Sequence, residues 1–264
     1  PGSNGKAAVT EQTKAAYRLF DELQKRYPQV EIESCSSGGA RVDYEILKRA
    51  QRFWSSDNID AYTRQQIHRG MSYFYPPEVM GAHIGGSPCQ TTHRRFSIDY
   101  RGLTALFGHM GVELDPVKES AEERAGFAKY IALHKQLRPL LHSGDVFRLD
   151  HHDERTLIHG VVAKDKSEGV VLISQLDMPD YKQMGKLRVP YFDPQAVYQV
   201  KVLSIPDYIR EGKAGHLMKV FPQWLLDCFA EKEVTIRSEW LANAGLTIPV
   251  LDPQSALLLA FKKR

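Results

Sequence analysis

The sequence has few cysteines and no long hydrophobic run, and these two shortages exclude several classes of protein. Its 264 residues contain three cysteines, Cys35, Cys89 and Cys228, which are too few and too widely spaced for a disulfide framework or a zinc knuckle. This usage is typical of a reducing compartment, so we expect a cytoplasmic protein. No stretch approaches the roughly 20 apolar residues of a membrane span, and no membrane contact is expected.

An excess of one charge and the common catalytic motifs are also lacking. The 35 basic and 32 acidic side chains are interspersed, and a net charge of +3 without a basic tract predicts no nucleic-acid partner. No Gly-x-Ser-x-Gly elbow and no phosphate loop occurs. The run His151-His152-Asp153 has no third ligand at a metal-binding spacing, which favours a solvated turn and predicts no metal.

Apolar residues make up 42% of the chain and charged residues 25%, as in ordinary globular proteins. In residues 1–142 strand-like runs alternate with helical patterns, and this alternation predicts βα units around a parallel sheet. The strand-like runs are 30–34, 52–56 and 110–114, and the helical patterns are 7–26, 61–70, 100–108 and 116–141. Polar residues follow the strands, as on the C-terminal face of a (β/α)₈ barrel.

Residues 143–264 show a different pattern, with β-rich runs in place of alternating strands and helices, and they form the second expected domain. Short β-rich runs, separated by turn residues, predict an antiparallel sheet arranged as a β-sandwich. These runs are 146–149, 157–162, 169–176, 186–190, 198–203 and 257–261, with an amphipathic helix expected at 217–229. The fold class predicted from these patterns is therefore an α/β domain followed by an all-β domain.

A small-residue turn, Cys35 to Gly39, stands between a strand and a helix. Gly38 and Gly39 would let the backbone come close to a ligand. The alternative is that the glycines only permit a tight turn, and spacing alone favours this alternative. A single cysteine such as Cys35 is usually a small buried residue.

Asp57 follows an aromatic strand that contains Trp54, where the chemistry of barrel enzymes is found. It could serve as a general acid or base, held or tuned by Asp60. The alternative is that Asp57 or Asn58 caps the next helix, and the pattern leaves both interpretations open. His83, also after a strand, could line a sugar pocket, although a structural histidine is slightly favoured.

Two of these segments together resemble glycoside hydrolase family 36. They read Glu-Ser-Cys-Ser-Ser-Gly-Gly-x-Arg-x-Asp at 33–43 and Phe-Trp-Ser-Ser-Asp-Asn-x-Asp-Ala at 53–61, with further similarity at 75–83 and 107–115. The resemblance implies the second half of a (β/α)₈ TIM barrel over residues 1–142 and a C-terminal antiparallel β-sandwich over residues 143–264. It implies a retaining α-galactosidase acting on α-galactoside substrates such as melibiose and raffinose.

The resemblance also assigns roles to residues. Asp57 becomes the proton donor and acid/base, while Cys35, Gly38, Trp54 and Arg41 become substrate-binding residues. Asp43 competes as an acid but ranks lower, because it is better placed to cap the following helix with Arg41 nearby. No cofactor is implied, since carboxylates and water suffice.

The family's nucleophile motif, Lys-Trp-Asp, does not occur in this sequence. The chain opens with Pro1-Gly2 and without methionine, so we expect an inactive fragment holding about four of the eight barrel strands. Open sheet edges predict association into a homo-oligomer. A smaller departure is His93, where the family pattern has glycine.

Alternatives within the family are an α-N-acetylgalactosaminidase and a raffinose synthase. In that family a cysteine at the place of Cys35 accompanies galactose specificity, so the resemblance favours the galactosidase. An alternative of another class is a non-catalytic carbohydrate-binding module, against which the barrel motifs argue, because such a module has no need of Asp57 after Trp54.

Overall fold

The structure is a computed structural model that describes residues 5, 7–180, 183–210 and 221–264. Its first sheet is parallel and four-stranded, in the order β1-β2-β3-β4. The strands are β1 (Glu33–Ser34), β2 (Arg52–Trp54), β3 (Met80–Gly85) and β4 (His109–Glu113). The predicted parallel sheet is therefore present, with the four strands that were expected.

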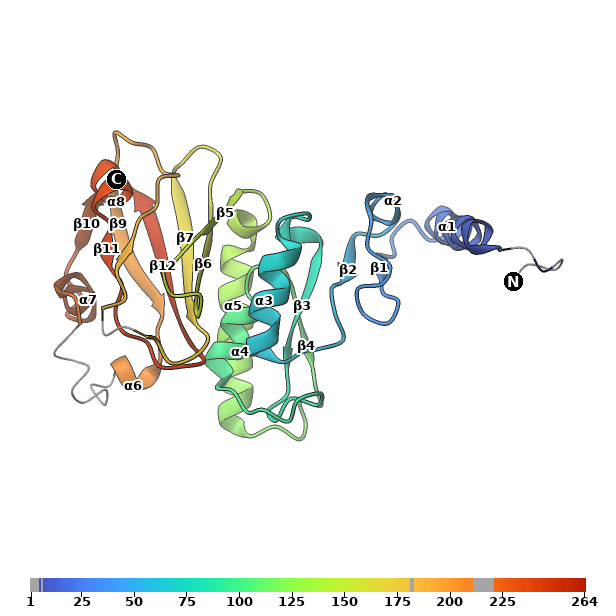
Figure 1. Ribbon diagram of the computed structural model, residues 1–264, viewed down its shortest axis with the longest axis horizontal. Helices are drawn as coiled ribbons and strands as arrows, with labels where there is room; N and C mark the ends of the chain where they lie inside the picture. The colour runs from blue at the N-terminus through green and yellow to red at the C-terminus, as the bar shows by residue number, and fades with distance from the viewer. Residues whose placement is uncertain (1–4, 6, 181–182, 211–220) are drawn as a thin grey trace.

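Helices connect these strands, and polar side chains cap most of them. The elements are α1 (Val9–Arg26), α2 (Tyr44–Leu47), α3 (Ala61–Met71), η1 (Pro77–Val79), α4 (Ile98–Ala105) and α5 (Ala121–Leu141). Ser97 and Ser120 accept hydrogen bonds from the first-turn amides of α4 and α5, which satisfies donors that a helix start leaves free. Helix α1 buries none of its residues and projects from the molecule beside α2 (Figure 1).

The second sheet is antiparallel and six-stranded, in the order β10-β9-β12-β7-β6-β5. Its strands are β5 (Asp145–Leu149), β6 (Thr156–Val162), β7 (Glu168–Gln175), β9 (Val197–Ser204), β10 (Val234–Arg237) and β12 (Ser255–Lys263). A two-stranded sheet pairs β8 (Lys186–Leu187) with β11 (Leu246–Thr247). Helices α6 (Asp207–Arg210), α7 (Gln223–Phe229) and α8 (Ser238–Asn243) complete the region.

Helices α3, α4 and α5 lie between the two large sheets (Figure 1). One apolar cluster joins these helices to the antiparallel sheet, where Val170 and Leu172 of β7 pack toward α4 and α5. A second cluster covers the opposite face of that sheet, with Val171 and Ile173 among its members. Because the first cluster spans both regions, the predicted division between residues 142 and 143 stays a prediction.

The predicted helix at 217–229 is confirmed only in its later part. The helix begins at Gln223, after Pro222 at the N-cap, and residues 217–220 lie outside those the structure describes. Pro222 suits this boundary because proline lacks the amide hydrogen that an earlier turn would require. Strands β10 and β11 and helix α8 fall in segment 206–250, whose pattern gave no assignment apart from the helix at 217–229.

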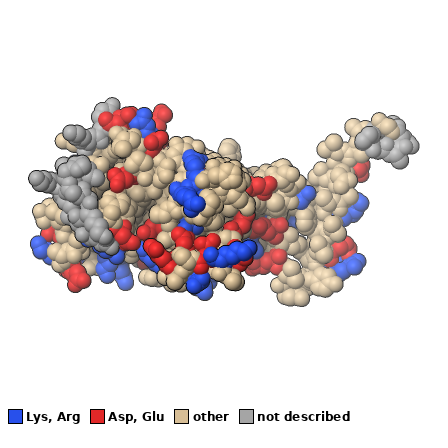
Figure 2. All heavy atoms as spheres, turned by 90° about the horizontal axis from the view of Figure 1, so that it is seen from below, with Lys and Arg blue, Asp and Glu red and all other residues tan. Residues whose placement is uncertain are grey.

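Acidic and basic side chains occur side by side on the face shown in Figure 2, as the interspersed charges of the sequence indicate. Among the helices in the described ranges, none combines the length and the apolar character needed to cross a membrane.

Candidate active site

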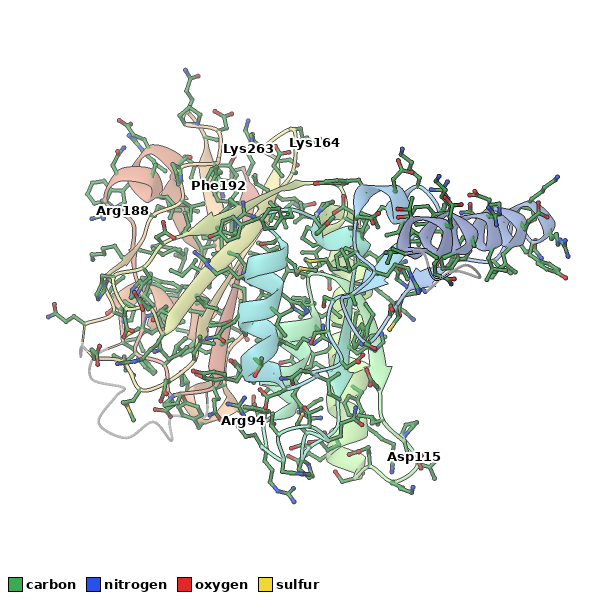
Figure 3. All side chains as sticks on the ribbon, turned by 45° about the vertical axis from the view of Figure 1, so that its right-hand side comes forward. Arg94, Asp115, Lys164, Arg188, Phe192 and Lys263 are labelled. Carbon is green, nitrogen blue, oxygen red and sulfur yellow. The ribbon has the colours of Figure 1, made fainter. Side chains whose placement is uncertain are left out.

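The predicted site residues lie at the carboxyl ends of the parallel strands, with Trp54 as the last residue of β2 and the others on the loops that follow. Cys35 follows β1, and Asp57 follows β2. Arg94 and Asp115, on the loops after β3 and β4, lie at the same end of the molecule (Figure 3). Chemistry on barrel-like sheets is placed at this end, because loops from several strands meet there.

The turn Cys35 to Gly39 packs directly on the backbone of residues 55–57. A Cβ atom on Gly38 would stand 2.8 Å from the Asp57 amide nitrogen, and one on Gly39 would stand 2.5 Å from the Ser55 carbonyl oxygen. Gly38 also has a positive φ of 71°, a conformation that favours glycine. The glycines therefore permit a close approach, and the partner in that approach is the loop that carries Asp57.

Cys35 is exposed at the edge of this turn. Arg41 Nη1 donates a hydrogen bond of 3.0 Å to the Cys35 carbonyl oxygen, and Ser34 Oγ donates one of 2.9 Å to the Arg41 carbonyl oxygen. Arg41 thus braces the turn from the far side of the glycines. Asp43 caps α2 by accepting a 2.7 Å hydrogen bond from the Ile46 amide, which confirms the capping role predicted for it.

Asp57 is exposed, and within the described ranges its carboxylate accepts no hydrogen bond. The helix cap predicted for Asp57 or Asn58 belongs instead to Asp60, whose Oδ1 accepts a 3.0 Å hydrogen bond from the Thr63 amide. Asn58 supports that cap, since its Oδ1 accepts a 3.0 Å hydrogen bond from the Asp60 amide. The Asp57 carboxylate is therefore available for proton transfer.

Asp60 is fully buried and joins two loops. Its oxygens accept hydrogen bonds of 2.8 and 2.7 Å from Nε and Nη2 of Arg94, and Thr92 Oγ1 donates another. Burial alone would raise the pKa of Asp60, but the hydrogen bonds from Thr92, the Thr63 amide and Arg94 lower the pKa below its ordinary value. Asp60 therefore stays ionised and anchors the loop after β3 to the start of α3.

Arg64 is a residue that sequence reasoning missed. It is 2% exposed, and Nε donates 2.6 Å to the Asn58 carbonyl oxygen, while Nη1 donates 2.5 Å to Ser55 Oγ. Nη2 donates to the Ser56 carbonyl oxygen. Burial lowers the pKa of Arg64 to about 10, so it remains charged at neutral pH. The available signal was its place in the first turn of α3, where side chains point back toward the helix start.

Trp54 is 6% exposed, and its ring contacts two charged or polar groups. The Arg64 guanidinium carbon lies 4.1 Å from the indole centroid, and the His83 ring centroid lies 4.2 Å away. His83 Nδ1 lies 3.1 Å from Glu113 Oε2, so the histidine has a partner, as the structural interpretation predicts. Contact between Trp54 and substrate stays a prediction.

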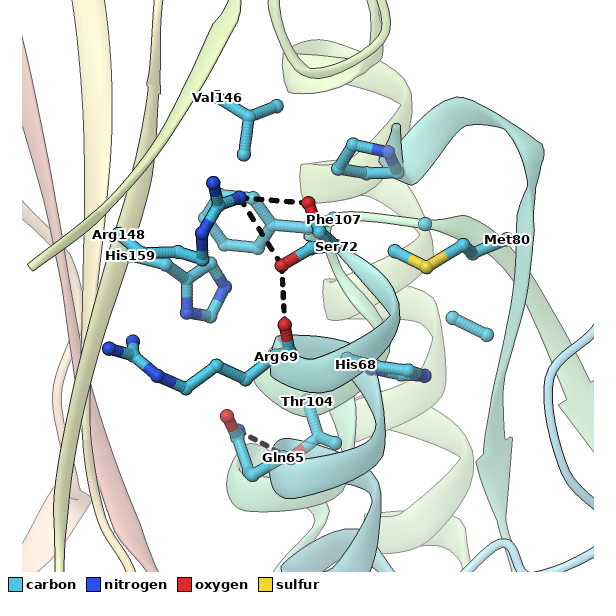
Figure 4. Close-up of a pocket in the computed structure, with 13 residues that line it drawn as sticks. Gln65, His68, Arg69, Ser72, Met80, Thr104, Phe107, Val146, Arg148 and His159 are labelled. Carbon is cyan, nitrogen blue, oxygen red and sulfur yellow. Dashed lines mark hydrogen bonds between the residues drawn. The ribbon is translucent and has the colours of Figure 1, made fainter. Parts of the chain in front are cut away.

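A separate cavity of about 30 Å³ lies between α3 and strands β5 and β6, and it holds none of the predicted site residues (Figure 4). Its lining includes His68, His159 and Arg148. Arg148 Nη1 donates 2.9 Å to the Ser72 carbonyl oxygen and so ties α3 to the antiparallel sheet. No group of three metal-ligating side chains occurs in the part of the chain that the structure describes.

Comparison with known proteins gives consistent matches. A family model described as Melibiase matches residues 2–144. An α-galactosidase from Escherichia coli is 48% identical over 262 residues, which cover 99% of this chain and 36% of that protein. The chain therefore spans about a third of the length of this relative.

Two solved structures are also similar. The galactosidase domain of α-galactosidase-sucrose kinase AgaSK superposes with a TM-score of 0.78 at 27% identity, over 94% of this chain and 31% of that one. The GH36 α-galactosidase AgaA from Geobacillus stearothermophilus, in complex with raffinose, gives a TM-score of 0.78 at 25% identity over the same shares.

Proposed function

This chain belongs to the melibiase family, glycoside hydrolase family 36, and on that premise we propose that the protein is a retaining α-galactosidase in which Asp57 is the acid/base. One observation carries the assignment. Asp57 is an exposed carboxylate, without a hydrogen bond in the described ranges, on a loop held beside the Cys35 turn. Such a group can exchange a proton with a substrate placed over the strand ends.

The reaction needs Asp57 in both protonation states. In the first step the protonated carboxyl donates its proton to the glycosidic oxygen while a second carboxylate attacks the anomeric carbon, and the aglycone leaves as an alcohol. In the second step the Asp57 carboxylate takes a proton from water, and the water oxygen displaces the enzyme carboxylate. The galactose released keeps the α configuration, because two inversions cancel.

The second carboxylate must lie about 5–5.5 Å from the first in a retaining enzyme. Asp60 is buried in its pair with Arg94, Asp43 caps α2, and Glu113 pairs with His83. We therefore place the nucleophile in the part of the relatives' length that this chain does not match. This chain alone is expected to bind the acid/base side of the substrate without turning it over.

Substrate recognition is proposed for the turn beside Asp57. Cys35 and Gly38 would contact the galactosyl ring, with Arg41 holding the turn and Trp54 forming the floor beneath the loop. Galacto-oligosaccharides such as raffinose and melibiose are the proposed substrates, supported by the raffinose complex of the similar AgaA structure. The architecture proposed is half of a (β/α)₈ barrel, supported by the four-stranded parallel sheet, followed by a β-sandwich.

The test compares Asp57→Ala with the unaltered protein, both expressed from the full coding sequence. Melibiose has a poor leaving group that needs protonation, whereas p-nitrophenol leaves without it. We expect kcat/KM for melibiose to fall about 10²–10⁴-fold and to fall far less for p-nitrophenyl α-galactoside. Asp150→Asn, at a fully exposed acid in the second region, is the matched control. Equal losses on both substrates would show that Asp57 is not the acid/base.

A further inference from the structure

We infer that Arg64 is the residue that positions Asp57 for proton transfer, an inference that rests on the proposed function. Arg64 is 2% exposed, so it reaches neither solvent nor a substrate above the loop. Its donors reach the residues on both sides of Asp57, namely Ser55, Ser56 and Asn58. Arg64 therefore fixes the position of the Asp57 backbone through the residues beside it, without a hydrogen bond to the Asp57 carboxylate.

The guanidinium is itself held in one plane. It lies 4.1 Å from the Trp54 ring, and a Cβ on Gly81 would stand 2.9 Å from Trp54 Cε3, so the indole rests directly on β3. The His83 ring contacts the same indole at 4.2 Å. Stacking therefore fixes the orientation in which the guanidinium presents its fork of donors.

The opposite side of the loop is closed by the glycine turn. A Cβ on Gly38 would come within 2.8 Å of the Asp57 amide nitrogen, so the backbone of Asp57 has no room to move toward β1. Arg64 holds the loop from the α3 side and Gly38 stops it from the β1 side. Between these two restraints only the Asp57 side chain projects freely, which is the arrangement a proton donor requires.

The charges around Arg64 fit this role. Burial lowers the pKa of Arg64, while the nearby Glu113 and Asp57 carboxylates favour its charged form. The guanidinium of Arg64 presents several donors in a fixed plane and so reaches three separate acceptors, whereas a lysine ammonium is a single charged group that cannot reach all three. Arg64→Lys should therefore keep part of the activity that Arg64→Met loses.

The experiment measures kcat and KM of Arg64→Met and Arg64→Lys in the full-length protein, on melibiose and on p-nitrophenyl α-galactoside. For Arg64→Met we expect kcat on melibiose to fall about 10–100-fold, with KM changed less than about threefold, because a small misplacement of a catalytic group is costly. The loss in kcat/KM should be several-fold smaller on the aryl substrate than on melibiose, because p-nitrophenol leaves without protonation. Arg64→Lys should lie between Arg64→Met and the unaltered protein.

Arg69→Met is the matched control on the same helix, because Arg69 bonds to Leu149 and Ile158 of the antiparallel sheet and not to the loop. It should lower the melting temperature without separating the two substrates. Ser55→Ala, which removes only the acceptor of Nη1, provides the same readout if Arg64→Met does not fold.

The outcomes separate the inference from the proposed function. If Asp57→Ala separates the two substrates and neither Arg64→Met nor Ser55→Ala does, the positioning role is wrong and the acid/base assignment stands. If Asp57→Ala itself does not separate them, the proposed function fails. Selective loss in all three variants, with partial recovery in Arg64→Lys, supports both.

Discussion

The two large sheets differ in how their faces are used. In the antiparallel sheet, alternate residues of β7 enter separate apolar clusters, so both faces are buried. In the parallel sheet, Phe53, Ala82 and Ile84 face the helices, while the other face carries polar and aromatic groups. These groups are Glu33, Arg52, Trp54, His83, His109 and Glu113.

This difference means that the antiparallel sheet mainly stabilises the fold, whereas the polar face of the parallel sheet mainly serves the proposed reaction. The polar face is organised by pairs such as Arg52 with Glu33 and His83 with Glu113, which fix directions but add little net stability. The apolar faces supply the free energy of folding. Substitutions in the antiparallel sheet should therefore change stability, and those around the parallel strand ends should change catalysis more than stability.

The largest stability effect is expected for Leu257→Ala. Leu257 is 0% exposed in β12, a central strand of the antiparallel sheet. Removing its side chain should lower the free energy of unfolding by about 2–5 kcal/mol, measured by urea denaturation. Activity per folded molecule should be unchanged. A loss of that activity would contradict the conclusion that the antiparallel sheet contributes to stability and not to catalysis.

Gly39→Ala should lower activity, which Leu257→Ala should leave unchanged. The added methyl group would meet the Ser55 carbonyl oxygen at 2.5 Å and push the turn away from the Asp57 loop. We expect a loss of about 1–3 kcal/mol in stability and a fall of at least about tenfold in kcat. Gly70→Ala in α3 is the control, because no atom lies within 4 Å of its added methyl group. That variant should gain about 0.5–1 kcal/mol.

The junction between the two regions should be sensitive to acid. Burial first, and then Arg64 and His159, lower the pKa of His68 to about 3. Burial first, and then Arg69 and Arg148, lower the pKa of His159 to about 4. Both histidines are therefore neutral in the folded protein at pH values where the unfolded chain, with a pKa of about 6.5, already binds protons.

The free energy of unfolding should fall as the pH is lowered, because the unfolded chain then binds protons that the folded protein does not. Above about pH 6.5 both states hold the same protons and the stability is full, whereas from there down toward pH 4 the unfolded state gains protons and stability falls. Each histidine contributes up to about 1.4 kcal/mol per pH unit. His159→Gln should flatten the dependence of unfolding free energy on pH between 4 and 6.5, measured by urea denaturation across that range.

A gain in stability is expected from a substitution at His93. His93 has a φ of 58°, in the left-handed region, at the position where the family pattern has glycine. His93→Gly should raise the free energy of unfolding by about 1 kcal/mol, because glycine adopts this conformation without steric cost. His93→Ala keeps the strained backbone and should show no gain in the same denaturation experiment.

Sequence periodicity was sufficient for most elements because apolar residues mark the buried faces. The strand-like runs 30–34, 52–56 and 110–114, the four helical patterns of residues 1–142 and the long β-runs after residue 143 were predicted in this way. In segment 206–250 only the helix at 217–229 was predicted, because the two-residue strand β11 and the four-residue strand β10 are too short to show a period.

The site roles stay predictions, whereas the positions of their residues can be described. The turn that holds Cys35 and Gly38 packs on the loop that carries Asp57. The cap at Asp60 and the loop contacts of Arg64 were not foreseen, because a cap can fall on any of several acids and a buried arginine looks like a surface residue in a helix pattern. These contacts depend on how the loops fold back over α3.

The most direct test of the account is the product that the Asp57→Ala variant of the full-length protein forms from p-nitrophenyl α-galactoside in the presence of azide. Without its base, the galactosyl-enzyme waits for a nucleophile that needs no deprotonation, and azide should enter from the face that water normally uses. The account predicts α-galactosyl azide with recovery of turnover. Formation of β-galactosyl azide would identify Asp57 as the nucleophile, and no azide product at all would exclude it from the acid/base role.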